Sequence, residues 1–495
     1  MPLFSQRRGV NLAGAEFGET VFPGTLGKEY TFNSETSFRY FAAKSLNLLR
    51  VPVRWERLQP ALRAPLNTAY LNLLKTNSAW ARASNAQIII DVQNFGRYTS
   101  NGQELVIGSS RLSADDLADL WVKLSAEFRN DDGVFAYGLM NEPHDLGFAD
   151  WRVISQTVMT AIRNTGDRKL ILVPGDSWSS AEAWPRANGS NAWINDPANN
   201  FAFEAHTYFD SDNSGSYKLS YDQELGRNPS LAQIGPARLK NFADWCQANK
   251  VRGFLGEFGV PNSDPRWLTV LDNFLTALDA SGMDGLYWAA GEWWGNYPLS
   301  IQPAGTFNVD RPQLPVLLRH LGPAAFTTVA ATTFDGWIFA PDSLVSGFGR
   351  NLPADATVQL TDSTGTKRQA KVLYQSAGQV NYAIPAETAL GKLVVEVGGA
   401  SGVFWLEQSA PSLFAGTQLE RPYLTLYGTG FRNAKAVEVK VNGSPVKVLY
   451  AGPQNQYAGL DQVNVELPGG VIGQLAVTIS ADGKMSNQVN VELLM

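Results

Sequence analysis

A chain of 495 residues is too long for one ordinary domain, so its length predicts two or three. A net charge of −6 without a long Lys/Arg run argues against a nucleic-acid-binding protein, and no apolar run is long enough to span a membrane. The single cysteine, Cys246, excludes an intrachain disulfide and any zinc site built on several thiolates.

The first two thirds of the chain alternate between short apolar runs and amphipathic stretches. Eight runs have the length and composition of strands: 8–14, 47–53, 87–93, 134–140, 169–175, 201–208, 253–259 and 284–291. One helix-like stretch between them begins at Ser113 with Asp116 three residues later, as capped helices do. Eight such units predict an α/β fold, a (β/α)₈ TIM barrel over residues 1–325. A doubly wound sheet is the alternative, but nothing in that fold favours stopping at eight units.

The sequence changes character after Gly322. Residues 323–333 resemble a linker, and beyond them short alternating strands and Gly/Pro turns replace helical periodicity. The tail also repeats itself, because VLY at 372–374 returns at 448–450 and QVN at 379–381 returns at 462–464. We therefore predict one or two all-β immunoglobulin-like sandwich domains, with modules at 326–408 and 409–495.

Two carboxylates stand at the ends of predicted strands. Glu142 follows the apolar run FAYGLM, and Glu257 lies at the end of GFLGEFG. Chemistry in a (β/α)₈ barrel sits at the carboxyl ends of the strands, and the fourth and seventh strands lie across the barrel mouth from each other. Either glutamate alone could cap a helix or pair with an arginine. Together they match the acid and the nucleophile or base that cleavage of a glycosidic bond requires.

Polar residues at other strand ends suit supporting roles. Arg50 would keep Glu257 ionised, and Tyr208 would donate a hydrogen bond to the same carboxylate. Asn141 would hold a sugar hydroxyl. His206 would orient the substrate or the acid, unless it is a satisfied structural histidine.

Five motifs, in this order along the chain, together resemble glycoside hydrolase family 5: LLRVPV, MNEPHD, HTYFDSDNSG, GEFG and YWAAGEWWG. The resemblance covers about residues 5–322 and is closest to the subfamily 5 endoglucanases. It implies a retaining (β/α)₈ enzyme with Glu142 as acid/base and Glu257 as nucleophile, and with Trp288 as the floor of the sugar subsite beside the cleaved bond. It also implies cleavage of internal β-1,4-glucan bonds. Mannanases, xylanases and xyloglucanases belong to the same family, so these activities stay open.

The chain departs from the family pattern after the third strand. Family members carry histidine there, in a D-x-H-N pattern, whereas this chain has Gln93 before Asn94. Glutamine hydrogen-bonds a sugar hydroxyl but cannot become charged. We therefore expect substrate binding or the pH profile to differ at that subsite.

Tryptophans near the strand ends are candidates for stacking platforms along a cleft: Trp55, Trp178, Trp293 and Trp294. About half of them are expected to touch substrate, because Trp is often largely buried. No cofactor and no metal are expected. The segment DSDNSG at 210–215 opens like a calcium loop, but its twelfth position is Tyr221 instead of glutamate.

The expected partner is a β-1,4-glucan, and we expect a monomer that binds neither nucleic acid nor membrane. A glycan-binding protein on a degenerate barrel is the rival from another class, and the intact carboxylate pair disfavours it.

FAPDSLVSGFGRNL and GQVNYAIP in the tail resemble an uncharacterised immunoglobulin-like module at the ends of secreted bacterial proteins. No signal peptide is visible in MPLFSQRRGVN, and a secreted, bacterial location is expected from the function. Tail aromatics are expected to be sandwich core and edge residues, with a glycan-binding face as the alternative: Tyr374, Tyr382, Trp405, Tyr423 and Tyr450.

Overall fold

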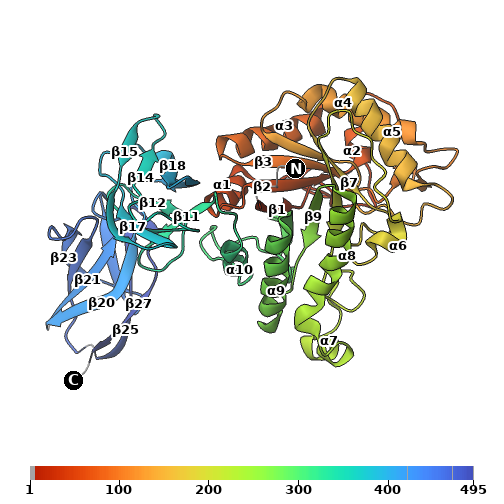
Figure 1. The fold of residues 1–495 in the computed structure, drawn as a ribbon. Coiled ribbons are helices and arrows are strands. Elements are labelled where there is room, and N and C mark those ends of the chain that lie inside the picture. Colours follow the sequence, from red (N-terminus) through yellow and green to blue (C-terminus); the bar gives the residue numbers. More distant parts are fainter. Residues whose placement is uncertain (1–5, 421, 471, 494–495) are drawn as a thin grey trace. The chain divides into compact units, whose positions relative to one another are not determined.

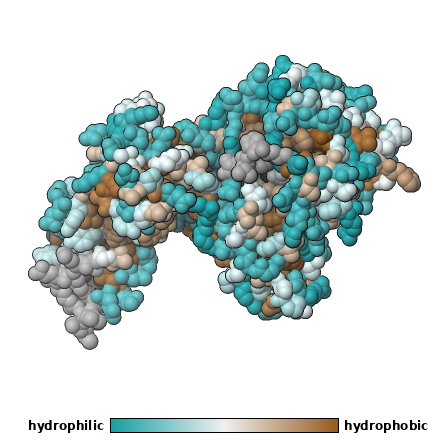
Figure 2. Space-filling model, viewed as in Figure 1, coloured by the Kyte–Doolittle hydropathy of each residue, from teal (hydrophilic) through white to brown (hydrophobic). Residues whose placement is uncertain are grey.

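The computed structural model describes residues 6–420, 422–470 and 472–493 (Figure 1). Residues 1–5, at the start of the stretch searched for a signal peptide, and the last two residues of the predicted second module lie outside this range. The chain divides into two compact units, one of Met1–Phe41 with Leu46–Gly322 and one of Ala42–Ser45 with Pro323–Met495. No helix of the described residues has both the length and the apolar character needed to cross a bilayer. Polar residues predominate on the surface seen in Figure 2, with apolar ones in small groups.

Eight parallel strands of the first unit form a closed barrel, as predicted. In chain order they are β1 (Arg8–Leu12), β2 (Leu48–Val53), β3 (Gln87–Val92), β6 (Val134–Gly138), β7 (Leu170–Pro174), β8 (Phe201–His206), β9 (Gly253–Phe258) and β10 (Asp284–Ala290). Each strand lies within one of the eight apolar runs. The chain order is also the order around the barrel, with β10 closing on β1, so β6 and β9 are the fourth and seventh strands.

Helices connect the strands and lie outside them (Figure 1). They are α1 (Glu35–Ala43), α2 (Trp55–Leu58), α3 (Thr68–Ala83), α4 (Ala114–Phe128), α5 (Trp151–Asn164), α6 (Trp184–Asn188), α7 (Tyr221–Arg227), α8 (Ile234–Asn249), α9 (Arg266–Ser281) and α10 (Leu314–Arg319), with a 3₁₀ turn at Leu231–Gln233. The predicted cap of α4 is present, since the backbone N–H and hydroxyl of Ser113 both donate to Asp116. A small hairpin, β4 (Arg97–Ser100) and β5 (Gln103–Val106), follows β3.

Apolar side chains fill the centre of the barrel. One buried cluster takes Ile89 from β3, Leu172 from β7 and Phe254 from β9, together with side chains of four other strands. Removing this apolar surface from water favours closure of the sheet, at roughly 25 cal/mol per Å² buried. The packed centre leaves the strands' carboxyl ends as the rigid rim on which the polar side chains stand.

The tail is built from β-sheets, most of whose strands pair antiparallel. One sheet has β11 (Phe326–Ala330), β13 (Leu344–Gly349), β17 (Gln379–Ala383) and β16 (Lys371–Gln375); another has β12 (Ile338–Phe339), β19 (Ala400–Leu406), β18 (Gly391–Val397), β14 (Val358–Thr361) and β15 (Lys367–Gln369). The last sheet has β20 (Ser412–Glu420), β21 (Tyr423–Thr429), β24 (Asp461–Glu466), β23 (Ser444–Pro453), β22 (Val437–Val441), β25 (Gly473–Ala481), β26 (Lys484–Met485) and β27 (Val489–Leu493). One apolar cluster lies within residues 326–406 and a separate one within 413–491.

The linker prediction for residues 323–333 was wrong in part. Phe326–Ala330 forms β11, a buried strand that pairs with β13. Its small residues and threonines resemble a linker in composition, but Phe326 is fully buried in the first apolar cluster of the tail. Burial of this ring, which composition alone does not reveal, accounts for the difference.

The sequence repeat in the tail corresponds to a repeated strand pair. Tyr374 of β16 lies opposite Asn381 of β17, and Tyr450 of β23 lies opposite Asn464 of β24, each beside a register shift. Tyr382 and Trp405 are buried, as expected of core residues. The exposed edge and face positions are Tyr374, Tyr423 and Tyr450.

Candidate active site

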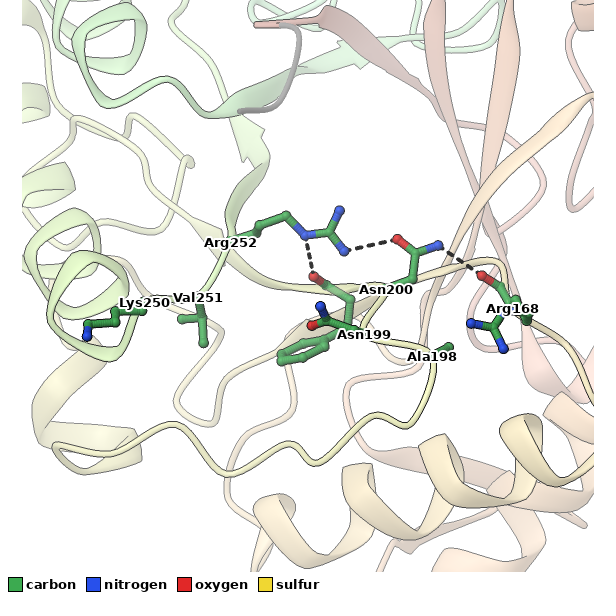
Figure 3. A pocket seen from close by; sticks show the side chains of 8 residues that line it. Arg168, Ala198, Asn199, Asn200, Lys250, Val251 and Arg252 are labelled. Atoms are coloured by element: carbon green, nitrogen blue, oxygen red, sulfur yellow. Dashed lines mark hydrogen bonds between the residues drawn. The ribbon is translucent and has the colours of Figure 1, made fainter. Parts of the chain in front are cut away.

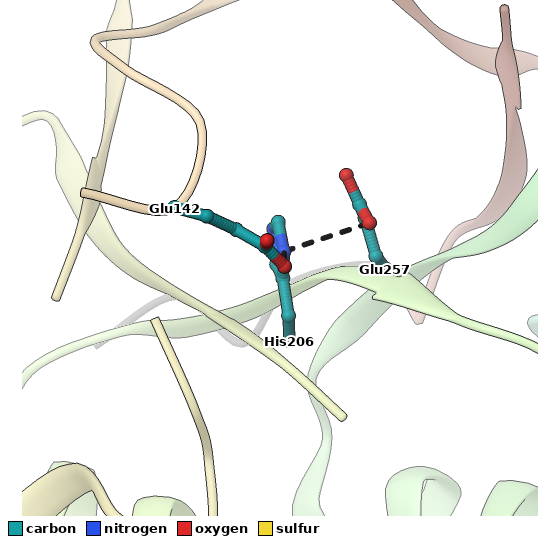
Figure 4. A group of neighbouring side chains, drawn as sticks. All are labelled: Glu142, His206 and Glu257. Carbon is teal, nitrogen blue, oxygen red and sulfur yellow. Dashed lines mark hydrogen bonds and ion pairs between the residues drawn. The ribbon is translucent and has the colours of Figure 1, made fainter. Parts of the chain in front are cut away.

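Glu142 and Glu257 lie together at the carboxyl end of the barrel. Glu142 is in the loop that follows β6, Glu257 is in β9, and His206 ends β8 between them (Figure 4). One side-chain ligand atom from each of the three residues lies within 4.8 Å of the other two. Two carboxylates this close fit the roughly 5 Å spacing of a retaining glycosidase, and not the wider gap that an inverting enzyme needs to admit water.

The surroundings of Glu142 favour its protonated form. Its Oε1 lies 2.7 Å from Nδ1 of His206. Burial raises the pKa of Glu142, and the charge of Glu257 raises it further, while the bond to His206 opposes the shift. The backbone at Glu142 has φ of 43°, a left-handed conformation that costs most residues about 1 kcal/mol or more. A strained, partly buried carboxyl group with a raised pKa is suited to general acid chemistry, and the 16% exposure of this side chain leaves it accessible to a ligand.

The two oxygens of Glu257 accept hydrogen bonds from different donors. Arg50 donates from Nη1 to Oε1 at 2.8 Å, and the hydroxyl of Tyr208 donates to Oε2 at 2.8 Å. His206 Nδ1 lies 3.7 Å from Oε2. Burial, followed by the charge of Glu257, raises the pKa of Tyr208 well above its ordinary value, so its hydroxyl keeps its proton and remains a donor. These contacts fix the orientation of the Glu257 carboxylate.

Arg50, the third residue of β2, connects most of the site. Its side chain is fully buried, and its Nη1 and Nη2 donate to the side-chain oxygens of Asn11 and Asn141, each at 2.8 Å. It also forms ion pairs with Asp91 at 2.9 Å and Glu204 at 3.4 Å.

Asn11, Asp91 and Glu204 were missed by the sequence interpretation. A signal for the last two was present, because each is a charged residue inside an otherwise apolar strand, IIIDV or FAFEAH. Such a residue is buried only with a partner, and here the partner is Arg50.

Two carboxylates and an imidazole this close together can bind a metal ion in other proteins. The chemistry of Glu142, His206 and Glu257 favours a hydrogen-bonded array instead. Burial alone would lower the pKa of His206, yet Glu257, Glu142 and Glu204 raise it to about 10. An imidazolium carries a proton on both ring nitrogens and has no lone pair for a metal. That the site needs no metal stays a prediction.

A cavity of about 1060 Å³ opens beside this array and is lined by Glu142, His206, Tyr208 and Trp178 among others. The ring of Trp178 is half exposed and stacks on His144, with centroids 4.4 Å apart and planes at 14°. His144 in turn lies 2.9 Å from Asp145. Trp178 is therefore a supported platform on the cavity wall.

Three further residues that the sequence analysis singled out are buried beside the site. Trp55 is fully buried and cannot stack on substrate, which corrects its prediction as a platform. Asn94 is also buried, where it accepts from the backbone of Trp55 and donates to Glu56, so its side chain supports the loop instead of facing a ligand. Gln93 is buried with no hydrogen-bond partner for Oε1 among the described residues.

Three more tryptophans lie on or after β10. Trp288 is half-buried within β10, and its ring centroid lies 6.0 Å from that of Trp294. Trp294 stacks on Tyr297 with centroids 4.2 Å apart, and Trp293 is 41% exposed. The residues that line the cavity beside Glu142 include none of these three tryptophans.

A second cavity, of about 490 Å³, lies at the opposite end of the barrel, where β8 and β9 begin (Figure 3). Arg252 donates there to the backbone oxygen of Phe201 and to Asn200, which donates to the backbone of Arg168. None of the described residues lining this cavity carries a carboxylate. It therefore lacks the acid and nucleophile that the first site contains.

Sequence comparison agrees with this geometry. The family model described as cellulase (glycosyl hydrolase family 5) matches residues 9–293, more than half of the chain. Endo-beta-1,4-glucanase B of Emericella nidulans is 31% identical over 299 residues, which span 60% of this chain and 85% of that protein. Endoglucanase 3 of Humicola insolens is 31% identical over 301 residues, 60% of this chain and 72% of that protein.

Solved structures give the same result for the barrel. The endoglucanase Cel5A of Pseudomonas stutzeri, in complex with cellobiose, is 37% identical with a TM-score of 0.59, and the match covers 64% of this chain and 92% of that one. XacCel5A in complex with cellopentaose is 39% identical with a TM-score of 0.58, and covers 64% of this chain and 99% of its own. The chain therefore belongs to glycosyl hydrolase family 5, the cellulase family, and is a glycoside hydrolase with the retaining chemistry of that family.

Proposed function

We propose that this protein is a retaining endo-β-1,4-glucanase in which Glu142 is the acid/base and Glu257 the nucleophile. The observation that carries the proposal is the pair of carboxylates within 4.8 Å, one held by Arg50 and Tyr208 and the other bound to His206. The relatives named as endoglucanases, and the related structures with cellobiose and cellopentaose, support a β-1,4-glucan as the substrate.

The first step forms a covalent intermediate. A carboxylate oxygen of Glu257 attacks the anomeric carbon, and the bond from this carbon to the glycosidic oxygen breaks. Glu142 gives its proton to the departing oxygen, so the leaving chain departs as a neutral alcohol. Asn141 would support this step: its side-chain oxygen accepts from Arg50, which fixes the amide, and its N–H groups would donate to a sugar hydroxyl.

The second step releases the sugar. Glu142, now a carboxylate, takes a proton from a water molecule whose oxygen attacks the same carbon. The ester bond to Glu257 breaks, which restores the nucleophile as a carboxylate and Glu142 as an acid. Two inversions at one carbon leave its β configuration unchanged.

The stereochemistry of the first product tests this function directly. Proton NMR of a cello-oligosaccharide digest should show the β-anomer first, with the α-anomer growing only by mutarotation. A parallel reducing-sugar assay on carboxymethylcellulose, β-glucan, mannan, xylan and xyloglucan should give the highest rate on a β-1,4-glucan. First appearance of the α-anomer would contradict the double displacement, and a higher rate on mannan or xylan would reassign the polymer.

Replacing Trp178 with alanine should weaken productive binding without removing turnover. Loss of one stacked ring costs about 1–2 kcal/mol, so kcat/KM on cello-oligosaccharides should fall about 5- to 30-fold, mostly through KM. The matched control is Tyr457→Ala, which removes an exposed aromatic ring of the tail that does not line the cavity. Equal kinetics for the two variants would show that Trp178 does not bind substrate.

We propose further that residues 326–408 and 409–495 are separate immunoglobulin-like modules that act as a spacer or stabilising platform. The two separate apolar clusters and the repeated strand pair support this division.

The resemblance of the tail to modules of secreted bacterial proteins supports the proposal that this protein is secreted. A monomer is expected to run at 54.0 kDa in light scattering.

A further inference from the structure

A third carboxylate, Glu204, lies beneath the candidate catalytic pair. It is in β8, two residues before His206, so both side chains point to the same face of the strand. Glu204 is 1% exposed. Its Oε1 lies 3.5 Å from Nε2 of His206 and 3.4 Å from Nε of Arg50. It therefore contacts the partner of the acid and the partner of the nucleophile at once.

The neighbouring strand leaves room for this contact. A Cβ atom added to Gly256 of β9 would lie 2.0 Å from Oε1 of Glu204 and 2.7 Å from Nε2 of His206. Any larger residue at position 256 would displace one of the two groups. The absence of a side chain there is what allows the carboxylate and the imidazole to approach each other.

We propose that Glu204 is a positioning residue: it holds His206 in its doubly protonated form and so keeps the transferable proton of Glu142 on Oε2, away from the histidine. The inference rests on the proposed role of Glu142 as the acid. Glu204 itself touches neither substrate nor reacting atoms.

The argument follows from the hydrogen bonds of the imidazole. A doubly protonated His206 donates from Nδ1 to Oε1 of Glu142, so the carboxyl proton must sit on the other oxygen. A singly protonated ring with its proton on Nε2 would instead accept from Glu142 at Nδ1. The proton of the acid would then point at the histidine, and Glu142 could not donate it to the glycosidic oxygen. A negative charge at Nε2 prevents this by stabilising the second proton of the ring.

The other charges around the histidine are consistent with this role. The titratable and charged groups around His206 and Glu204 come from five barrel strands or the loops that follow them: Glu142, Glu257, Tyr208, Arg50 and Asp91. Burial raises the pKa of Asp91 to about 8. Burial also opposes ionisation of Glu204, but Arg50 and His206 outweigh it and lower its pKa. Arg50 and His206 therefore favour the carboxylate form of Glu204.

Titration of the histidine ring by NMR tests the inference without any substrate. The chain has three histidines, His144, His206 and His320, so imidazole ¹⁵N spectra are simple to assign with single variants. In the wild-type protein His206 should stay doubly protonated to about pH 9, because its pKa is raised to about 10. In Glu204→Gln its midpoint should fall by about 1–3 pH units, as expected when an adjacent opposite charge is removed.

Kinetics supply the second measurement. Glu204→Gln should leave KM on cello-oligosaccharides within about twofold, since Glu204 does not contact substrate. At acid pH the His206 ring is protonated in both proteins, so the ratio of wild-type to variant kcat should be close to one. Above the lowered His206 midpoint of the variant, this ratio should grow to about 10–100. The loss should be greatest for poor leaving groups. The matched control is Asp284→Asn, which removes a buried carboxylate at the first residue of β10, at the other end of the barrel.

Two outcomes would overturn the inference. The first is a wild-type His206 that titrates near 6.5, the ordinary value for histidine, which needs no variant to observe. The second is a Glu204→Gln variant whose His206 midpoint and pH-dependent kcat ratio equal those of Asp284→Asn. Failure of the proposed function looks different: the protein would cleave no β-1,4-glucan while the coupling between Glu204 and His206 still appeared in the spectra.

Discussion

Replacing Glu257 with alanine should lower kcat on β-glucan by at least about 10⁴-fold, because the variant cannot form the covalent intermediate. KM should change less than kcat, since the attack of Glu257 on the anomeric carbon contributes mainly in the transition state. The measurement is a reducing-sugar assay with the wild-type protein in parallel. Glu127→Ala, which removes an exposed carboxylate of α4 that pairs with Lys75, serves as the control and should retain full activity.

Azide separates loss of the nucleophile from loss of the fold. In Glu257→Ala a small anion can enter the vacated space and attack the anomeric carbon of an activated aryl cellobioside in one displacement. The product should be the α-glycosyl azide, with inverted configuration. Retention of more than a tenth of the wild-type kcat by the variant would contradict the assignment.

Replacing Glu142 with alanine should lower kcat/KM on β-glucan by about 10²–10⁴-fold, the usual contribution of general acid catalysis. The loss should be small in kcat/KM for aryl cellobiosides with good leaving groups, because these depart without a proton. The pH profile should also change. Since the pKa of Glu142 is raised, the wild-type acid stays protonated to higher pH than an ordinary glutamate, and activity falls as pH rises through that pKa. In the variant this alkaline fall should disappear.

Azide again distinguishes the roles. In Glu142→Ala the covalent intermediate still forms with an activated substrate, and azide then attacks it from the opposite side without base assistance. The product should be the β-glycosyl azide, the opposite anomer to that from Glu257→Ala. An equal loss of kcat/KM on every leaving group would show that Glu142 is not the acid. An α-azide from this variant would show that the two roles are exchanged.

The sequence by itself determined the barrel and the rim on which its two candidate carboxylates stand. Apolar runs of strand length, each followed by a helix or long loop, are a local signal, and all eight became barrel strands. Parallel strands in a barrel all present their carboxyl ends on one rim, so the order of the runs alone placed Glu142 and Glu257 on the same side. Their roles as acid and nucleophile remain a proposal, which the two alanine variants test.

Only the tertiary structure decided which side chains meet. Asp91 and Glu204 lie far from Arg50 in sequence, and their charges make sense inside apolar strands only once those strands surround the arginine. Trp55 and Trp178 look alike in sequence, yet one is buried against the barrel and the other is half exposed on the cavity wall. Phe326 likewise turned an apparent linker into a strand. Burial depends on how distant segments pack, and periodicity within one segment carries no information about that packing.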